Sequence, residues 1–129
     1  MKKKYLIVIA NYYKDVSKGL LDSALKLIPK SNTIKIIEVP GVFEIPVTIS
    51  KNINKYDGFL ALGCVIKGKT PHFDFICQAS TNAIMDLSIN YKKPIGNGII
   101  TCLNKRQAIE RKKKGREAAE AVISVLSQK

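Results

Sequence analysis

The stretch YLIVIA, Tyr5 to Ala10, is apolar at every position and shows no alternation with polar residues. A strand buried on both faces has this character, because both rows of its side chains pack against helices. A second run of the same kind, GFLALGCVI, spans Gly58 to Ile66. Two such runs in one short chain predict the central strands of a parallel β-sheet.

The segments around these runs predict a regular alternation of strands and helices. Two further strands are expected over 33–39 and 95–103, the second opened by Pro94. Apolar residues spaced three and four positions apart predict helices over 16–28, 43–53, 72–91, 105–112 and 115–127. This β-α-β-α-β-α-β-α order predicts an α/β fold with a four-stranded parallel sheet covered by helices on both faces. We expect one domain over residues 1–129.

Length and composition exclude several classes of protein. The chain has 129 residues and is 46% hydrophobic, which rules out a disordered chain. Its longest apolar runs are too short for a membrane span or a signal peptide. The three cysteines, Cys64, Cys77 and Cys102, are odd in number and lack CxxC spacing, which argues against a disulfide framework or a metal site. We expect a cytoplasmic protein without a bound metal.

The chain is strongly basic, with 22 Lys and Arg against 10 Asp and Glu, a net charge of +12. Such a charge attracts nucleic acid, anionic lipid or phosphorylated small molecules. Only Arg106, Arg111 and Arg116 are arginines, although base recognition favours arginine, and the lysines are spread along the whole chain. The one dense cluster, 111–114, is either a solvated surface or a phosphate site. We expect neither nucleic acid nor a membrane as partner.

Ligands of open parallel sheets bind beyond the carboxyl ends of the strands. This rule selects three loops, 11–13, 40–44 and 67–72. The last of them contains His72, the only histidine, which could exchange protons near neutral pH or simply cap the following helix. It also contains the Gly68-Lys69-Thr70 turn, which could bind an anion at the helix start or be an ordinary glycine turn.

The other two loops carry aromatic and acidic side chains. Phe43 could pack on a ligand ring or belong to the core, and Glu44 could accept hydrogen bonds from ligand hydroxyls or cap a helix. One of Tyr12 and Tyr13 could stack on an aromatic ligand, with packing in the turn as the alternative. The cysteines are interpreted as small core residues, and no basic residue adjoins Cys64 in sequence to activate it.

Two long segments, VPGVFEIP (39–46) and ALGCVIKGKTPHFD (61–74), resemble the 6,7-dimethyl-8-ribityllumazine synthase family. The segments PIGNGIIT (94–101) and QAIER (107–111) match it in the same order. The resemblance implies a flavodoxin-like three-layer sandwich and the penultimate step of riboflavin synthesis. In that step 5-amino-6-(D-ribitylamino)uracil condenses with 3,4-dihydroxy-2-butanone 4-phosphate, and phosphate and water are released. The resemblance implies no metal or organic cofactor, and a homopentamer or a pentamer-based assembly.

The resemblance also implies a binding site for the uracil substrate. Tyr12 would stack on the pyrimidine ring, and Asn97 would contact the pyrimidine from another side. Further contacts to the ribitylaminouracil would come from two short segments, Val42, Phe43, Glu44 and Cys64, Val65, Ile66.

The roles implied for the second substrate concern its phosphate and the protons of the reaction. Lys69 and Thr70 would bind the butanone phosphate, and Arg111 would clamp its phosphate group. His72 would be the proton donor. The loop after Arg111 is shorter than is usual in the family, so Lys112 or Lys114 could share the phosphate role, and the size of the assembly stays open.

The position of Asn97 gives a separate argument for self-association. It lies near the start of the predicted strand 95–103, about 17 Å from the carboxyl end of that strand at 3.3 Å per residue. Asn97 therefore cannot easily reach the loops of its own subunit. If it lines the site, a neighbouring subunit supplies it, together with Arg111, and the active site lies at a subunit interface.

Two alternative functions remain open at this point. An archaeal-type riboflavin synthase has a similar fold and dismutates two lumazine molecules, but a phosphate-binding loop and Arg111 have no role in that reaction. A non-catalytic basic module would bind nucleic acid with salt-sensitive affinity and would not depend on His72.

Overall fold

The structure, a computed structural model, describes residues 2–69 and 71–128. Within these ranges four parallel strands form one sheet in the order β2-β1-β3-β4. The strands are β1 (Lys4–Ala10), β2 (Thr33–Val39), β3 (Gly58–Ile66) and β4 (Ile95–Cys102). The helices are α1 (Lys14–Leu25), the 3₁₀ turn η1 (Val42–Glu44), α2 (Ile45–Lys51), α3 (His72–Tyr91), α4 (Lys105–Glu110) and α5 (Lys114–Leu126).

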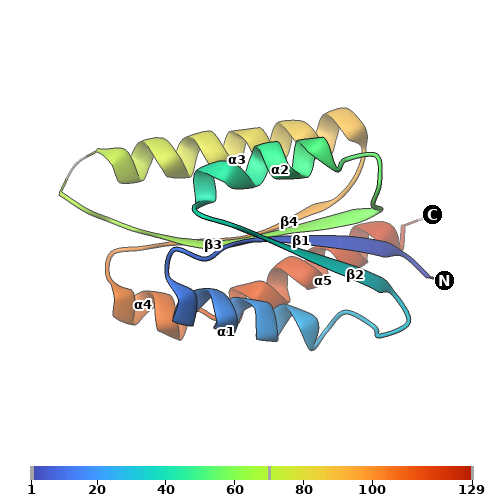
Figure 1. Cartoon of the computed structure of the whole chain (residues 1–129), viewed down its shortest axis with the longest axis horizontal. Coiled ribbons are helices and arrows are strands. Elements are labelled where there is room, and N and C mark those ends of the chain that lie inside the picture. Colours follow the sequence, from blue (N-terminus) through green and yellow to red (C-terminus); the bar gives the residue numbers. More distant parts are fainter. Residues whose placement is uncertain (1, 70, 129) are drawn as a thin grey trace.

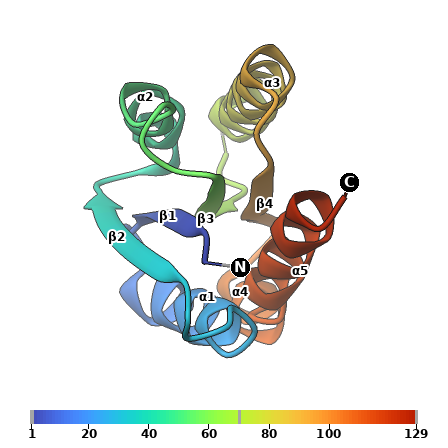
Figure 2. The ribbon, with the colours of Figure 1, turned by 90° about the vertical axis from the view of Figure 1, so that its right-hand side faces the viewer.

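The helices form two layers on opposite faces of the sheet. In Figure 1, α2 and α3 lie above the strands, and α1, α4 and α5 lie below them. Figure 2, a view turned by 90°, shows the same two layers with the sheet between them. This arrangement is a flavodoxin-like three-layer α/β fold, and it confirms the architecture predicted from the strand and helix order.

The apolar runs of β1 and β3 are explained by these two layers. Successive side chains of a strand point to opposite faces, so Tyr5, Ile7 and Ile9 enter the core beneath α1 and α5. Leu6 and Val8 enter the second core beneath α2 and α3. Both strands are central in the sheet and need apolar residues at every position.

The edge strand β4 has a different pattern, because one of its faces is only partly covered. Gly96, Gly98 and Cys102 are buried, whereas Asn97 and Thr101 on the other face are exposed. Both glycines are required by close packing: Gly96 lies against α5, and a Cβ atom at Gly98 would lie 2.4 Å from the Cδ2 atom of Leu62 on β3. A Cβ atom at Gly96 would lie 2.2 Å from the carbonyl oxygen of Ala118.

The predicted boundaries differ from the observed ones at a few places. The helix predicted over 43–53 is divided into η1 and α2, with Pro46 in the first turn of α2. The last strand stops at Cys102, one residue earlier than predicted, because the Asn104 side chain accepts a hydrogen bond from the Gln107 backbone N–H (2.9 Å) and starts α4. This side-chain cap ends the extended segment.

Backbone hydrogen bonds beyond the strand ends hold the predicted ligand loops at one edge of the sheet. The Asn11 N–H donates to the Val39 carbonyl oxygen (3.0 Å), which ties the loop after β1 to the end of β2. The Lys67 N–H donates to the Cys102 carbonyl oxygen (2.8 Å), which ties the loop after β3 to the end of β4. All these loops leave the sheet from its carboxyl edge.

Candidate functional site

A hollow of about 320 Å³ opens where the three predicted ligand loops meet. Its lining comes from the loop after β1, the turn after β2, the end of β3 and the start of α3. The lining residues are Tyr12, Tyr13, Gly41, Val42, Phe43, Cys64, Val65, Ile66, His72 and Ile76. We call this the carboxyl-edge hollow. The topological rule therefore located a real cavity, and it gathers many of the proposed site residues.

Close packing between η1 and β3 forms one wall of the carboxyl-edge hollow. Val42 is buried, and its Cγ2 atom would lie 2.9 Å from a Cβ atom at Gly63. The absence of a side chain at Gly63 lets η1 settle onto the end of β3. A hydrogen bond from the Glu44 N–H to the Gly41 carbonyl oxygen (3.2 Å) closes the turn. The wall is therefore built by the backbone, before any ligand is present.

Two aromatic rings stand at the rim of the hollow. Tyr12 is 74% exposed and Phe43 is 63% exposed, so Phe43 does not belong to the core, the alternative that its sequence left open. Tyr12 packs edge-on against Tyr13, with ring centroids 4.9 Å apart and an interplanar angle of 81°. This contact leaves large aromatic surface available to a planar ligand.

His72 and Glu44 have different surroundings. His72 is the first residue of α3, is exposed and lines the hollow. Glu44 precedes α2, and its side chain makes no capping hydrogen bond there. Instead its Oε1 atom lies 3.2 Å from where a Cβ atom of Gly41 would be, which directs the carboxylate toward the turn bordering the hollow. Glu44 does not itself line the hollow.

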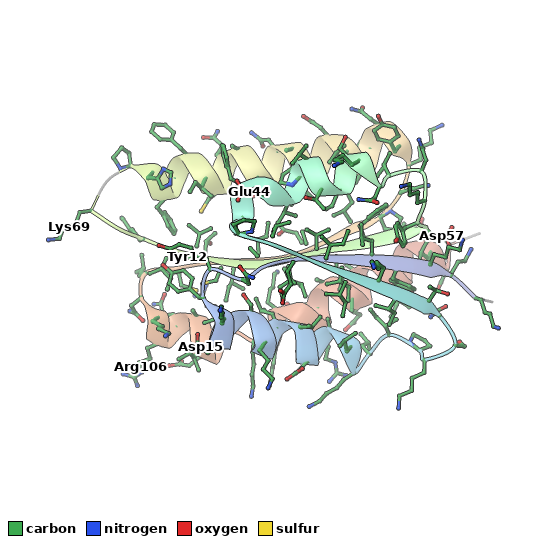
Figure 3. All side chains as sticks on the ribbon, viewed as in Figure 1. Tyr12, Asp15, Glu44, Asp57, Lys69 and Arg106 are labelled. Carbon is green, nitrogen blue, oxygen red and sulfur yellow. The ribbon has the colours of Figure 1, made fainter. Side chains whose placement is uncertain are left out.

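The predicted anion-binding turn is only partly described. Thr70 lies outside the described residues. Lys69 is exposed, and Figure 3 shows it at the tip of the loop, pointing away from Tyr12 and from the body of the molecule. The structure therefore does not bring Lys69 into the carboxyl-edge hollow.

Asn97 and Arg111 lie in a different hollow, of about 580 Å³, beside the edge strand β4. Its lining residues are Thr81, Asn97, Ile99, Ile100, Thr101, Glu110, Arg111, Lys113, Lys114 and Glu117. We call this the edge-strand hollow. The two hollows share no lining residue, so one chain does not bring Asn97 and Arg111 to His72.

The edge-strand hollow contains a group of cations. Arg111 donates a hydrogen bond through Nη1 to the Thr101 carbonyl oxygen (3.2 Å), which holds its side chain against β4. Lys113 and Lys114 line the same hollow. Lys112 instead lines a groove between α1 and α5. Of the two lysines considered as partners of Arg111, the structure places Lys114 beside it and Lys112 elsewhere.

The cysteines differ in position, and all three are free thiols. Cys64 lines the carboxyl-edge hollow, and burial, together with the neighbouring Cys102, raises the pKa of its thiol to about 12. A thiol with such a pKa stays protonated at neutral pH and is a poor nucleophile. Cys102 is buried in the same core, whereas Cys77 on α3 is half-buried. The pKa of the Cys77 thiol is raised by its burial and by the nearby Asp74.

Three lining residues were not among the proposed site residues: Tyr13, Gly41 and Ile76. Ile76 follows His72 by four positions, so one helical turn places both on the same face of α3. That spacing was a usable signal in the sequence. Gly41 lies within the recognised 39–46 segment. Tyr13 belongs to the predicted ligand loop 11–13, where the sequence left open which of Tyr12 and Tyr13 would stack on a ligand.

The described part of the chain lacks two features. Residues 2–69 and 71–128 contain no group of three or more His, Cys, Asp or Glu side chains arranged to hold a metal ion. None of the helices in these ranges is both long enough and apolar enough to cross a membrane.

Comparison with known proteins links the whole chain to one group. A family model described as 6,7-dimethyl-8-ribityllumazine synthase matches residues 2–129. A protein of Bartonella tribocorum with that name is 42% identical, with 100% of this chain and 93% of the relative covered. The Cutibacterium acnes protein of the same name is 41% identical, with 96% of this chain and 80% of the relative covered. A third, from Agrobacterium fabrum, is 38% identical, with 100% and 97% covered.

Proposed function

The chain belongs to the 6,7-dimethyl-8-ribityllumazine synthase family. On this basis we propose which part of the reaction each of the two hollows performs. The chain is a transferase of riboflavin biosynthesis that condenses 5-amino-6-(D-ribitylamino)uracil with 3,4-dihydroxy-2-butanone 4-phosphate. The observation that carries the assignment of residues is the carboxyl-edge hollow, where residues from distant segments converge. The riboflavin synthase and nucleic-acid alternatives are not favoured by the comparisons.

In our proposal the carboxyl-edge hollow binds the ribitylaminouracil. The exposed rings of Tyr12 and Phe43 offer aromatic surface to the planar pyrimidine. Val42, Val65 and Ile66 form an apolar wall beside it. Glu44 lies at the Gly41 turn and can accept hydrogen bonds from substrate hydroxyls that extend past the rim.

His72 supplies acid–base chemistry in this proposal. The substrates already contain a nucleophilic amine and an electrophilic ketone, so the protein need not provide a covalent nucleophile. The raised pKa of the Cys64 thiol is consistent with this division of roles. Imine formation, phosphate elimination and ring closure each need proton transfers, and an exposed imidazole on the wall can perform them. Positioning of the two reactants provides the larger part of the rate enhancement.

The edge-strand hollow binds the phosphate of the second substrate, and a neighbouring subunit presents it. Arg111 and Lys114 are close enough to line one hollow, which suits a doubly charged phosphate group. Asn97 pairs in register with Ala61, well before the carboxyl end of the sheet. A complete site therefore needs the carboxyl-edge hollow of one subunit and the edge-strand hollow of the next.

This requirement supports a ring, which we propose to be a homopentamer or an assembly of pentamers. A head-to-tail contact between two different surfaces produces closed rings. Large apolar side chains exposed on α2 and α3 support such a contact, among them Val47, Phe75 and Ile89. Lys69 and Thr70 keep their proposed phosphate role in this arrangement. We also propose a cytoplasmic location, to be checked by cell fractionation.

The first experiment measures formation of the lumazine chromophore by absorbance with both substrates. The wild-type protein should form it, and His72→Ala should slow the reaction by about 10²-fold without abolishing it. The matched variant His72→Asn, which keeps a polar side chain of similar size, should be slowed to a similar degree. A His72→Ala protein that folds and binds substrate normally but has no detectable activity would contradict our division between positioning and proton transfer. Flavin formation from purified lumazine alone would favour the riboflavin synthase alternative.

The second experiment tests the shared site. His72→Ala and Arg111→Ala subunits are unfolded together and refolded as a mixture. In a head-to-tail ring about a quarter of the sites should then have both residues intact, and activity should recover to about a quarter of the wild-type value. His72→Ala mixed with a His72→Ala/Arg111→Ala double variant is the control and should show no recovery. Equal activity of the two mixtures would disprove the shared site.

A further inference from the structure

Two side chains of the α4 region reach back to the end of β4. Gln107 accepts, through Oε1, a hydrogen bond from the backbone N–H of Leu103, the first residue after β4 (2.9 Å). Arg111 donates through Nη1 to the carbonyl oxygen of Thr101 within β4 (3.2 Å). Residues four positions apart lie on the same side of a helix. Gln107 and Arg111 therefore link one side of α4 to the chain at the end of β4.

The backbone of Gln107 takes part in the same turn. Its N–H donates to the Oδ1 atom of Asn104, the N-cap residue of α4 (2.9 Å). Together the two hydrogen bonds of Gln107 resemble a capping box, in which side chain and backbone exchange bonds across the first turn. Among the described residues, no other helix has an N-cap side chain that accepts a hydrogen bond. The side chains of Asn104 and Gln107 therefore set the path of the chain from β4 into α4.

The helix α4 depends on such links because it is short. It contains six residues, too few for a helix that is stable without tertiary contacts. Ala108 is buried in the core beneath α1 and α5, but one small side chain does not fix the direction of a helix. The ion pair between Lys105 and Asp15 is exposed and contributes little. The hydrogen bonds of Gln107 therefore have a large part in how α4 lies against β4.

The orientation of α4 matters for Arg111, which directly follows it. Arg111 is exposed, and a long exposed side chain loses conformational entropy when it binds a ligand. The bond to the Thr101 carbonyl oxygen reduces this cost and leaves further N–H donors of the guanidinium for a phosphate. This bond requires α4 to hold Arg111 at the correct distance from β4. Gln107 does not itself line the edge-strand hollow, so it can act there only through Arg111.

We propose that Gln107 is a positioning residue for Arg111: by accepting the Leu103 N–H it holds α4 against the end of β4, so that the Arg111 guanidinium is oriented in the edge-strand hollow before the phosphate of the butanone substrate arrives. This assignment rests on the proposed function and deepens it. Binding residues whose geometry is fixed by supporting hydrogen bonds bind more tightly than loosely held ones. Loss of the Gln107 acceptor should therefore weaken phosphate binding, and only while Arg111 is present.

The first test replaces Gln107 with methionine, which has a similar length and helix propensity but no strong acceptor. In the lumazine-forming assay, Gln107→Met should raise KM for the butanone phosphate by about tenfold. We expect kcat to change by less than about twofold and KM for the ribitylaminouracil to stay at the wild-type value. The inhibition constant of inorganic phosphate, measured in competition with the butanone phosphate, should rise by the same factor. Gln128→Met, the same replacement at an exposed position beyond α5, is the control and should match the wild type.

A double-mutant cycle separates positioning from a general structural role. Arg111→Ala alone should raise KM for the butanone phosphate. Gln107→Met added to Arg111→Ala should raise it no further, because no guanidinium is left to orient. Thermal unfolding followed by circular dichroism checks that every variant is folded at the assay temperature.

Two results would overturn the assignment and leave the proposed function intact: a wild-type KM for the butanone phosphate in Gln107→Met while Arg111→Ala raises it, or an equal rise from Gln107→Met with and without Arg111. An unchanged KM in Arg111→Ala would instead overturn the phosphate role of Arg111, and this assignment with it. A wild-type protein that forms no lumazine from the two substrates would overturn the proposed function itself.

Discussion

The two helical layers of this protein differ in how closely their helices pack and in how much apolar surface they expose. On one face of the sheet, α5 packs so closely on α1 that a Cβ atom at Gly115 would lie 2.0 Å from the carbonyl oxygen of Leu20. On the other face, α2 and α3 expose large apolar side chains to solvent. These exposed side chains are Val47, Phe75, Met85, Ile89 and Tyr91, whereas the helices of the first face expose Ile109 on α4 and Val125 on α5.

The difference shows which apolar surfaces are buried within the single chain and which remain to be covered by a second one. The close approach of the two backbones at Gly115 holds α5 against α1 within the single chain. A group of exposed apolar residues is typical of a surface that a partner covers. The comparison therefore supports an assembly that uses α2 and α3.

The largest effect should come from disturbing the close helix contact. Gly115→Ala places a methyl group against the Leu20 carbonyl, and α5 must move away from α1. We expect a loss of about 3 kcal/mol in the free energy of unfolding, measured by urea denaturation. Gly68→Ala is the control, because no heavy atom of the described residues outside its chain neighbours lies within 4 Å of its added Cβ. Equal stability of the two variants would show that the α1–α5 contact tolerates expansion.

The next effect concerns the exposed apolar surface. Ile89 is 64% exposed on α3, so Ile89→Glu should change the stability of an isolated subunit by no more than about 0.5 kcal/mol. In the proposed assembly it buries a carboxylate, and we expect dissociation, seen by light scattering, with about 10²-fold lower activity. Lys18→Gln on the exposed side of α1 lowers the net charge by the same single unit and should leave assembly intact. A folded, fully active monomer would refute the shared site.

The thiols should show a smaller difference between the layers. Cys64 lies in the tightly packed core with its pKa raised to about 12, whereas Cys77 is half-buried on α3. We expect iodoacetamide at pH 8 to modify Cys77 at least about tenfold faster than Cys64, as measured by peptide mass spectrometry. In urea both should react at similar rates. Faster modification of Cys64 in the folded protein would mean that its core opens readily.

The smallest effect should come from the exposed ion pair between Asp15 and Lys105. The hydrogen bond from Lys105 is the main reason why the pKa of Asp15 is lowered. A lowered carboxyl pKa means that the stabilising contribution is present above about pH 4 and is lost as the pH falls through the lowered value. Asp15→Asn should therefore lower Tm slightly at pH 7, and the difference from wild type should vanish in acid.

Asp22→Asn on the same helix is the control for this last prediction, because Asp22 forms no ion pair among the described residues. High salt should also reduce the effect of Asp15→Asn, since the pair is exposed to solvent. An effect of Asp15→Asn that persists in acid would have to arise from packing and not from charge.

Much of this architecture was predictable because it depends on local patterns. The unbroken apolar runs of β1 and β3 identified the central strands, and apolar spacing located α1 and α3. The carboxyl-edge rule then identified the three loops whose residues form the hollow. The division of 43–53 into η1 and α2 was not predicted, because it depends on how Val42 packs against Gly63.

The position of the site residues relative to one another depended on packing between distant segments. From the sequence, Phe43 could have been a core residue, and only the fold places it at the rim with 63% exposure. Lys112 and Lys114 are two positions apart and looked equivalent, yet they line different hollows. Their side chains leave the turn between α4 and α5 in different directions, which composition and spacing do not encode.

The sequence by itself determined the order of strands and helices, the family and the chemistry, because apolar periodicity and short motifs are local properties of the chain. The sequence also placed Asn97 away from the loops of its own subunit, but only the tertiary structure decided that Lys114 shares a hollow with Asn97 and Arg111, and that Phe43 is exposed at the rim. Such relations arise where helices and strands remote in the chain pack together, and the contacts of each side chain then depend on residues far from it in sequence.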